Sequence, residues 1–582
     1  MGRMLLACLP LRVRAVFTMV GILAAGNSLS AQVDRVTGHS WSTRSPVYAP
    51  HAMVATSHPL VTQIGVDILQ AGGSAADAAV AINAALGLME VIGSGIGGDM
   101  LVIGWDAKHQ KVFGLNGSGR MPLGLSYEQM RLELLKLGRP DIPPYGMLPI
   151  SVPGVVDAWF ELHDKFGKLP MEKILQPAID YAENGFPVTD LISHYWVNSY
   201  AFHGRRPGAF RDTYGINGHA PTKGEVFRNP DLAATYRKIA QGGRDVFYRG
   251  EIADRMDDFF RKNGGWLRKE DFAAHKSEWC EPVSTTYRGY EVYELPPNTQ
   301  GIVTLMMLNI LEGFDLRSLG FGNPEALHLM IETKKLVFED RARWFGDPKF
   351  AEVPIKGLIS KDYAKERREL IDHRRASYRY ESGFPPLNTG DTISFAVADN
   401  DGNMIAVLQS NYRGFGSGVV IPGLGFCFQD RGQLFSMEPG HPNVYAPGKR
   451  PFHTNIPVFV KKDGKPWLAF GFMGGPMQPQ GQVQIITDLV DFDMDIQEAC
   501  DAARWQHNSS HEGTGELEDP TPYLTLESGF PWETVRALLM KGHDIRWDLG
   551  GFGGFQGVMR DHENHTWVGA SEGRKDGQAS GY

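Results

Sequence analysis

The sequence predicts an α+β fold, because helical and strand-like segments form separate groups along the chain. Helical periodicity is clearest at residues 61–71, 75–89, 155–166, 303–313, 325–344 and 529–541. Strand-like runs occur at 100–105, 111–115, 291–295, 393–399, 404–410, 456–461, 467–472 and 554–560. The strands lack the regular strand–helix–strand order of a doubly wound parallel sheet, which favours α+β.

Composition indicates an ordinary globular protein and argues against two classes of partner. Of the 582 residues, 42% are hydrophobic and 21% are charged, as in globular domains. The net charge is −9 and no Lys/Arg run is present, which argues against nucleic acid or an anionic membrane as partner.

The first residues have the pattern of a secretory signal peptide. Arg3, Arg12 and Arg14 precede an apolar run at 15–25, and Ser30-Ala31 offers a small-residue cleavage site. The run is short for a stable membrane span. We therefore expect residues 1–31 to be a signal peptide and the protein to be secreted or periplasmic.

Cysteine and histidine spacing predicts no metal, and we expect no cofactor. Cys280, Cys427 and Cys500 are too widely and irregularly spaced for a disulfide framework or a zinc site. They are expected to be small buried hydrophobic side chains. His562 and His565 have a ligand-like spacing, but no carboxylate or cysteine cluster surrounds them, so a surface loop is expected there.

Thr392 lies at the junction between a polar segment and a strand. The Pro- and Gly-rich stretch 376–391 precedes it, and a predicted β-hairpin with a turn at 399–403 follows. Cleavage between Asp391 and Thr392 would give one residue both a hydroxyl nucleophile and an α-amine. Such an amine titrates at pH ~7.7–8.0, which suits a general base. The simpler interpretation is that threonine there only favours the strand.

Blocks of residues along the chain match, in order, the pattern of a known family. Within 72–102 the chain reads Gly72-Gly73-Ser74-Ala75-Ala76-Asp77-Ala78-Ala79-Val80-Ala81 and then Ser94-Gly95-Ile96-Gly97-Gly98-Asp99. The family reads G-G-N-A-x-D-A-A-V-A and S-G-I-G-G-G. Further blocks are Val152-Pro153-Gly154, Phe247–Gly250, Glu294–Pro297, Asp340-Arg341, Gly346–Pro348 and Gly569–Arg574. On these blocks, which span nearly the whole chain after residue 50, the protein resembles the γ-glutamyltransferase family.

The resemblance implies a fold, a maturation step and a catalytic set. The implied fold is a four-layer αββα sandwich of the N-terminal nucleophile hydrolase type. One precursor would give a large subunit, 32–391, and a small subunit, 392–582. The implied catalytic residues are Thr392 as nucleophile, Ser410 as the second hydroxyl, and Gly474 and Gly475 as the oxyanion hole. A glycine pair after a strand is often only a turn.

Two short motifs suggest other functions but stand in the wrong context. Gly93–Gly98 satisfies G-x-G-x-x-G, yet a helical pattern precedes it and a strand follows, the reverse of a dinucleotide-binding loop. Gly569–Gly573 satisfies G-x-S-x-G, but no histidine follows Ser571 to complete a hydrolase triad.

Several positions that hold the substrate's α-amino and α-carboxylate groups in the family have changed here. The carboxylate-binding arginine falls on Ser118, with Arg120 close by, and an asparagine falls on Tyr412. The groups that hold the ammonium fall on Arg431 and Leu434, and a serine pair falls on His453 and Thr454. Because Arg431, Arg413, His453 and Arg120 add positive character, we expect the ammonium not to be recognised. The alternative is a locally shifted match, or side chains that point away from the pocket.

We therefore expect a self-cleaving threonine hydrolase or acyltransferase. Its expected partners are a small-molecule substrate, a γ-glutamyl or related anionic acyl amide, and the two subunits of one precursor. The reaction would pass through an acyl-enzyme, with hydrolysis favoured over transpeptidation. Two alternatives stay open: an authentic glutathione hydrolase or γ-glutamyl transpeptidase, and an uncleaved, inactive binding protein.

Overall fold

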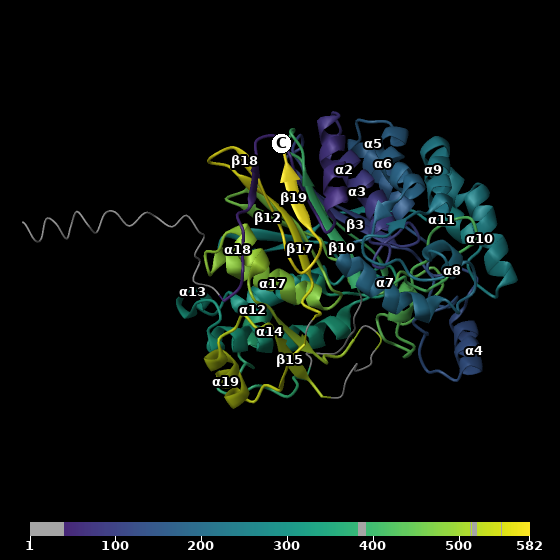
Figure 1. Ribbon diagram of the computed structural model, residues 1–582. Helices are drawn as coiled ribbons and strands as arrows, with labels where there is room; N and C mark the ends of the chain where they lie inside the picture. Colours follow the sequence, from purple (N-terminus) through teal and green to yellow (C-terminus); the bar gives the residue numbers. More distant parts are fainter. Residues whose placement is uncertain (1–39, 382–390, 513, 515–520, 549) are drawn as a thin grey trace, which may run out of the picture. The chain divides into compact units, whose positions relative to one another are not determined.

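Two antiparallel seven-stranded sheets organise the chain (Figure 1). The computed structural model describes residues 40–381, 391–512, 514, 521–548 and 550–582, with the backbone alone at 391–393. Residues 41–582 form one unit, and residues 1–40 form another, of which only Ser40 is described. The predicted signal peptide and most of the stretch 376–391 therefore lie outside the described residues.

The order of strands in each sheet brings distant segments together. The first sheet runs β1 (Val47–Ala49), β18 (Thr566–Ser571), β17 (Gly554–Asp561), β13 (Lys465–Met473), β12 (Val458–Lys462), β9 (Tyr290–Glu294) and β8 (Val283–Tyr287). The second runs β19 (Gln578–Gly581), β2 (Met53–Thr56), β10 (Asp391–Ala398), β11 (Met404–Tyr412), β3 (Asp99–Asp106), β4 (Lys111–Gly117) and β7 (Glu278–Cys280). Strands from both predicted subunits are thus neighbours in each sheet.

Helices occur before, between and after the strands. Those up to residue 274 are α2 (Pro59–Gln70), α3 (Ala75–Met89), α4 (Tyr127–Leu137), α5 (Val155–Phe166), α6 (Met171–Asn184), α7 (Asp190–His203), α8 (Phe210–Tyr214), α9 (Pro230–Tyr248), α10 (Glu251–Lys262) and α11 (Lys269–Ala274). Later ones are α12 (Gly301–Leu311), α13 (Leu316–Leu319), α14 (Pro324–Trp344), α15 (Ile355–Leu358), α16 (Lys361–Arg368), α17 (Met477–Val490), α18 (Ile496–Asp501) and α19 (Trp532–Lys541). Short elements are β5 (Phe186–Pro187), β6 (Val226–Phe227), β14 (Trp505–Asn508), β15 (Tyr523–Leu526), β16 (Ile545–Arg546) and a 3-10 turn at Arg431–Leu434.

Alternation along the strands divides the core. In β10, Phe395 and Val397 join the apolar cluster formed with helices such as α3 and α5, whereas Ala396 and Ala398 join a cluster shared with β12 and β13. A separate large cluster packs α12, α14 and α17 against β13 and β17. Alternate residues of β10 therefore pack against helices on one side and against β12 and β13 on the other.

The predicted α+β class is confirmed, and many element boundaries agree with the periodicity. Helices α3 and α5 have the predicted limits, and the strand predicted at 404–410 is β11. Ser74 begins α3 with a capping box in which Asp77 closes the reciprocal bond, the sequence signature of a helix start.

Helix α17 was not predicted because its sequence reads as polar. It is buried along its whole length and carries glutamines whose amides bond to backbone carbonyls of neighbouring segments. Gln482 Nε2 donates to Ile456 O (2.5 Å), and Gln484 Nε2 donates to Trp505 O (3.0 Å). Buried glutamines that are satisfied in this way remove the hydrophobic pattern on which helix prediction depends.

Two further sequence expectations concern cysteines and membrane spans. Cys427 and Cys500 are buried, as expected, while Cys280 is partly exposed. Across the described part of the chain, none of the helices combines the length and apolar character needed to span a bilayer.

Candidate active site

The peptide bond predicted to be cleaved lies at the start of β10. Asp391 pairs with Tyr412 of β11 and Ile393 pairs with Gln409, so the register shifts at Thr392. The strand begins at Asp391, one residue earlier than the junction expected from the sequence, within the usual spread of strand limits. The Thr392 side chain is outside the described part of the structure, and its catalytic role stays a prediction.

The start of β10 lies close to the end of β13. Ser394, two residues after Thr392, packs against Gly471, where an added Cβ would lie 2.5 Å from the Ser394 Cβ. Ser394 Oγ is also 3.4 Å from the Gly554 carbonyl oxygen. The contact is two residues after Thr392 on β10 and three residues before Gly474, which directly follows β13.

Gly474 and Gly475 have backbone conformations that favour glycine. Their φ angles are +115° and +59°, and a Cβ on Gly474 would lie 3.1 Å from the Gly553 Cα. No hydrogen bond donated by either amide is found among residues 40–381 and the described residues after 390. Two unshielded N–H groups of this kind can stabilise a developing oxyanion.

A buried glutamine holds the glycine pair in place. Gln300 Nε2 donates to the Gly475 carbonyl (3.0 Å) and to the Thr454 carbonyl (2.8 Å). Arg341 Nη1 in turn donates to Gln300 Oε1 (2.6 Å). Gln300 and Arg341 are fully buried, so this chain of bonds ties the Gly475 carbonyl to the Thr454 carbonyl and to Arg341.

Ser410 and Tyr412 lie at the end of β11, opposite the start of β10. The Tyr412 N–H donates to Ser410 Oγ (2.7 Å), and Tyr412 has a φ of +81°, unusual for a non-glycine residue. The Tyr412 side chain is buried, and its hydroxyl has no hydrogen-bond partner in the described part of the chain. Burial raises the pKa of the Tyr412 phenol above its usual value, so the hydroxyl keeps its proton at neutral pH.

Arg431 is bound by other residues of the protein rather than left to face a substrate. Its Nη1 donates to Thr454 Oγ1 (2.9 Å) and its Nη2 donates to Asn455 Oδ1 (3.0 Å). Its Nε lies 3.7 Å from Asp99 Oδ2, and its guanidinium carbon lies 4.9 Å from the centre of the Tyr412 ring. Burial lowers the pKa of Arg431 to about 10, which leaves the side chain charged at neutral pH.

His453 is neutral, which corrects the positive character expected from the sequence. The Asn455 N–H donates to His453 Nδ1 (3.2 Å), so the ring proton is on Nε2, which donates to Asp99 Oδ2 (3.1 Å). Burial, and then the charge of Arg431, lower the pKa of His453 to about 4. Within the group formed by Asp99, Arg431 and His453, the negative charge of Asp99 therefore balances the positive charge of Arg431.

Sequence reasoning missed Asp99, although a signal was present. Asp99 stands where the family pattern S-G-I-G-G-G has its last glycine, so it departs from the pattern just as Arg431 and His453 do. It is fully buried, and its Oδ1 accepts bonds from the Gly119 N–H and from Gln429 Nε2, both at 2.8 Å. When a buried carboxylate and a buried arginine both replace residues of the family pattern, an ion pair between them is indicated.

Arg120 belongs to a second group of ion pairs. Its Nη2 lies 3.0 Å from Glu278 Oε1 and its Nη1 lies 3.3 Å from Asp347 Oδ2. Arg450 Nη1 binds the same Glu278 (2.7 Å), and its Nε donates to the Ser118 carbonyl (2.9 Å). The charge of Arg120 is therefore already compensated, and it is a weaker candidate for substrate binding than the sequence indicated.

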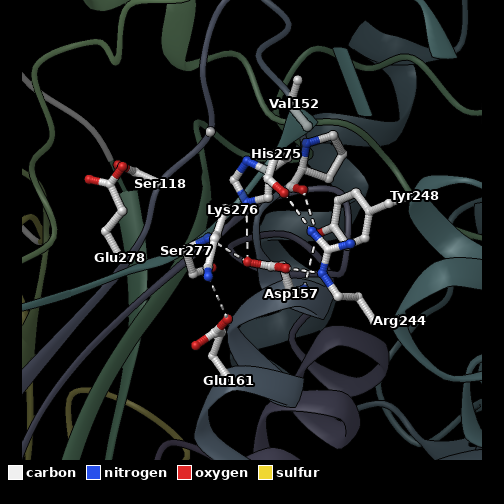
Figure 2. A network of polar contacts seen from close by, with 12 residues as sticks. Ser118, Val152, Asp157, Glu161, Arg244, Tyr248, His275, Lys276, Ser277 and Glu278 are labelled. Atoms are coloured by element: carbon white, nitrogen blue, oxygen red, sulfur yellow. Dashed lines mark hydrogen bonds and ion pairs between the residues drawn. The ribbon is translucent and has the colours of Figure 1, made fainter. Parts of the chain in front are cut away.

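Figure 2 shows the polar network that supports the segment carrying Glu278. Asp157 of α5 accepts bonds from Arg244 and from the Ser277 N–H, and Arg244 also donates to the His275 carbonyl (2.5 Å). Tyr248 Oη donates to the carbonyl of Pro153 in the Val152-Pro153-Gly154 block (2.8 Å). The network fixes the start of β7, which positions Glu278 beside Arg120 and Arg450.

A cavity of about 630 Å³ lies beside the predicted oxyanion pair. Gly474 and Pro476 line it on one side. Its other lining includes three cations, one carboxylate and three tyrosines: Arg413, Arg574, Lys575, Glu527, Tyr145, Tyr195 and Tyr523. Arg574 is paired with Glu527 (2.5 Å) and Glu572 (3.2 Å). The cavity is thus a polar space with a positive balance of charge, open to a substrate that reaches Gly474.

A second cluster of possible metal ligands lies elsewhere. His328, Glu332 and His543 bring ligand atoms within 4.8 Å of one another. However, Glu332 already accepts bonds from Lys335 Nζ (2.6 Å) and Tyr380 Oη (2.6 Å), and His328 Nδ1 is 2.9 Å from His543 Nε2.

The two expected surface histidines, His562 and His565, lie in the turn between β17 and β18.

Comparison with known proteins identifies relatives over almost the whole chain. A glutathione hydrolase-like YwrD proenzyme from Bacillus subtilis (strain 168) is 37% identical, covering 91% of this chain and 98% of its own. A glutathione hydrolase proenzyme from Escherichia coli (strain K12) is 33% identical, covering 92% and 93%.

Solved structures and a family model agree with these relatives. The crystal structure of cephalosporin acylase from Bacillus halodurans matches with a TM-score of 0.85 and 41% identity, covering 95% of this chain and 99% of the acylase. The model of the gamma-glutamyltranspeptidase family matches residues 61–582. The relatives are hydrolases and acylases, and their proenzyme names imply precursors that are cleaved into subunits. The chain therefore belongs to the γ-glutamyltranspeptidase family.

Proposed function

We propose that the protein is a self-cleaving threonine hydrolase that acts on anionic acyl amides through an acyl-enzyme. The observation that carries this proposal is the contact of Ser394 with Gly471 and Gly554. Ser394 follows Thr392 by two residues and Gly471 precedes Gly474 by three, and neither the Gly474 nor the Gly475 amide donates a hydrogen bond within the described residues, which supports the proposal. The mature protein would consist of residues 32–391 and 392–582, arranged as a four-layer αββα sandwich. It would be secreted or periplasmic after removal of residues 1–31.

Maturation would begin with attack of Thr392 Oγ on the carbonyl carbon of Asp391. The peptide C–N bond breaks, the Thr392 nitrogen takes up a proton as it leaves, and an ester links the two residues. Water then hydrolyses this ester, which gives the Asp391 carboxylate and restores the Thr392 hydroxyl. The new α-amine is the general base for later turnovers, because its ordinary pKa of about 8 suits proton transfer near neutral pH.

In turnover, the Thr392 hydroxyl attacks the carbonyl carbon of the substrate amide while the α-amine accepts its proton. The Gly474 and Gly475 N–H groups stabilise the oxyanion, and the α-amine returns the proton to the leaving amine. Water then attacks the acyl ester, releasing the carboxylic acid. Ser410 helps to orient the nucleophile.

The specificity that we propose follows from the group of Asp99, Arg431 and His453. In this chain these residues bond to one another where the family holds the substrate's α-amino and α-carboxylate groups. An incoming ammonium would have to compete with Arg431 for Asp99 and would meet a positive charge. The preferred acyl group would therefore lack the α-amino group, as in a glutaryl amide.

A pair of chromogenic amides tests this function. Glutaryl-p-nitroanilide should be hydrolysed with a kcat/KM equal to or above that of γ-glutamyl-p-nitroanilide, and Thr392→Ala should hydrolyse neither. A strong preference for the γ-glutamyl amide would instead favour a glutathione hydrolase, the activity named for the Escherichia coli relative. Absence of turnover on both amides, with an uncleaved chain, would favour a binding protein.

A further inference from the structure

We propose that Arg413 is the anion receptor of the acyl site, where its guanidinium binds a carboxylate at the far end of the substrate's acyl chain. This inference rests on the proposed amide hydrolysis and adds to it the residue that binds the carboxylate of the acyl group. The ligand would be an amide of a dicarboxylic acid, bound in the 630 Å³ cavity that Arg413 shares with Gly474.

Arg413 is placed in the cavity by a sharply turned segment. It follows β11 directly, and the residues at 412 and 415 have φ angles of +81° and +58°. Such conformations in non-glycine residues cost on the order of 1–3 kcal/mol each and occur often at functional sites. The Arg413 N–H donates to Asp430 Oδ1 (3.2 Å), and the Phe415 N–H donates to Ile92 O (2.7 Å), which fixes the turn.

The Arg413 guanidinium is anchored by one nitrogen and leaves two available. Its Nε donates to Gln433 Oε1 (2.8 Å), while no hydrogen bond of its Nη1 or Nη2 is found in the part of the chain that the structure describes. The side chain is 33% exposed. Two terminal N–H groups on a fixed, planar head can form a bidentate pair with a carboxylate.

Other arginines near the site are already occupied. Arg431 is fully buried and uses both terminal nitrogens on Thr454 and Asn455. Arg574 is paired with two glutamates. The Arg413 guanidinium can therefore bind an anion in the cavity without breaking a strong bond within the protein.

The counter-charge nearest to Arg413 is weak. Asp430 Oδ2 lies 3.9 Å from Arg413 Nε, and Asp430 is fully buried. Burial raises the pKa of the Asp430 carboxyl to about 7, against the lowering effect of Arg413, so this carboxyl is substantially protonated near neutral pH. Asp430 thus compensates the positive charge of Arg413 only in part, and a substrate carboxylate in the cavity can add to that compensation.

The test compares Arg413→Gln with wild type on matched amides. Glutaryl-p-nitroanilide carries the distal carboxylate, and pentanoyl-p-nitroanilide carries a methyl group in its place. Loss of a hydrogen bond to a charged group costs roughly 10- to 100-fold. We expect Arg413→Gln to lose that factor in kcat/KM on the glutaryl amide, mainly through KM, and less than about threefold on the pentanoyl amide. Arg413→Lys should retain part of the preference, and Arg261→Gln, an exposed site on α10, should match wild type.

Four results would overturn the inference. Equal losses on both amides would assign Arg413 a structural role, and unchanged kinetics would assign it none. If Arg413→Gln instead impaired pentanoyl 5-amido-2-nitrobenzoate, whose carboxylate is on the leaving amine, Arg413 would belong to the leaving-group side. If calorimetry finds that glutarate binds the wild-type protein no more tightly than Arg413→Gln, the receptor does not exist, whether or not either protein turns over. If the wild-type protein hydrolyses none of the amides but its binding of glutarate still depends on Arg413, the proposed hydrolysis is refuted and the receptor is not.

Discussion

Replacing Asp99 with asparagine removes the negative charge beside Arg431 while keeping the size of the side chain. Asp99 Oδ2 is 3.7 Å from Arg431 Nε and 3.1 Å from His453 Nε2. An asparagine can keep the bonds that Oδ1 accepts from Gly119 and Gln429. Its amide nitrogen would then face the His453 N–H and the guanidinium, so that donors oppose donors.

The expected loss of stability follows from these distances. Two unit charges 3.7 Å apart attract by about 4 kcal/mol at an effective dielectric constant of about 20. Removing one partner of a buried pair typically costs about 3–5 kcal/mol, because the other charge stays buried without compensation. We expect Asp99→Asn to lower the free energy of unfolding by about 4 kcal/mol, with the orphaned His453 N–H contributing part of that loss.

A double-mutant cycle with Arg431→Gln, followed by urea denaturation, measures the coupling. In the double variant no charge is left unpaired, so its loss should be smaller than the sum of the two single losses by at least about 1.5 kcal/mol. Asp258→Asn, at an exposed carboxylate paired with Lys262, is the control and should change stability by less than about 0.5 kcal/mol. Additive losses would refute the argument that Arg431 and Asp99 neutralise each other.

Two further outcomes are expected from the site. Gln300→Ala should lower kcat by about 10- to 100-fold with little change in KM, because Gly475 loses its positioning bond; a wild-type kcat would contradict this. The pKa of His453 is about 4 in the folded protein, against its ordinary value of 6.5. Between pH 6.5 and pH 4 the native state therefore binds fewer protons than the unfolded state. Stability should therefore fall as pH falls from 6.5 towards 4, by about 2 kcal/mol from this group at pH 5. His453→Gln should show a smaller fall in denaturation midpoint, and an equal fall would show that other groups dominate.

The sequence predicted those parts of the fold in which buried positions are occupied by apolar side chains. Helix α3 and strand β11 are buried at every residue and read as largely apolar runs, while α5 buries one apolar face, so all three could be located from the sequence. Helix α17 could not be predicted, since its buried glutamines satisfy carbonyls that only the tertiary structure brings near.

The candidate site was predictable as a set of positions but not as a set of interactions. Arg431 and His453 were identified as departures from the family pattern, yet the charge of their environment depends on Asp99, which is more than 300 residues earlier in the chain. Arg120 looked available in sequence because Glu278 and Asp347, which pair with it, are 158 and 227 residues later in the chain. Which cation stays available to a substrate could be decided only from the folded structure.

The intact mass of the purified, active protein tests the central claim most directly. Autoprocessing predicts two polypeptides, the smaller beginning Thr392-Ile393-Ser394-Phe395, and it predicts that Thr392→Ala stays a single chain without amidase activity. Thr392→Ser should still be processed in part, because its hydroxyl is kept. Active enzyme found as one uncleaved chain, or a Thr392→Ala protein that is cleaved and active, would contradict the threonine-nucleophile mechanism.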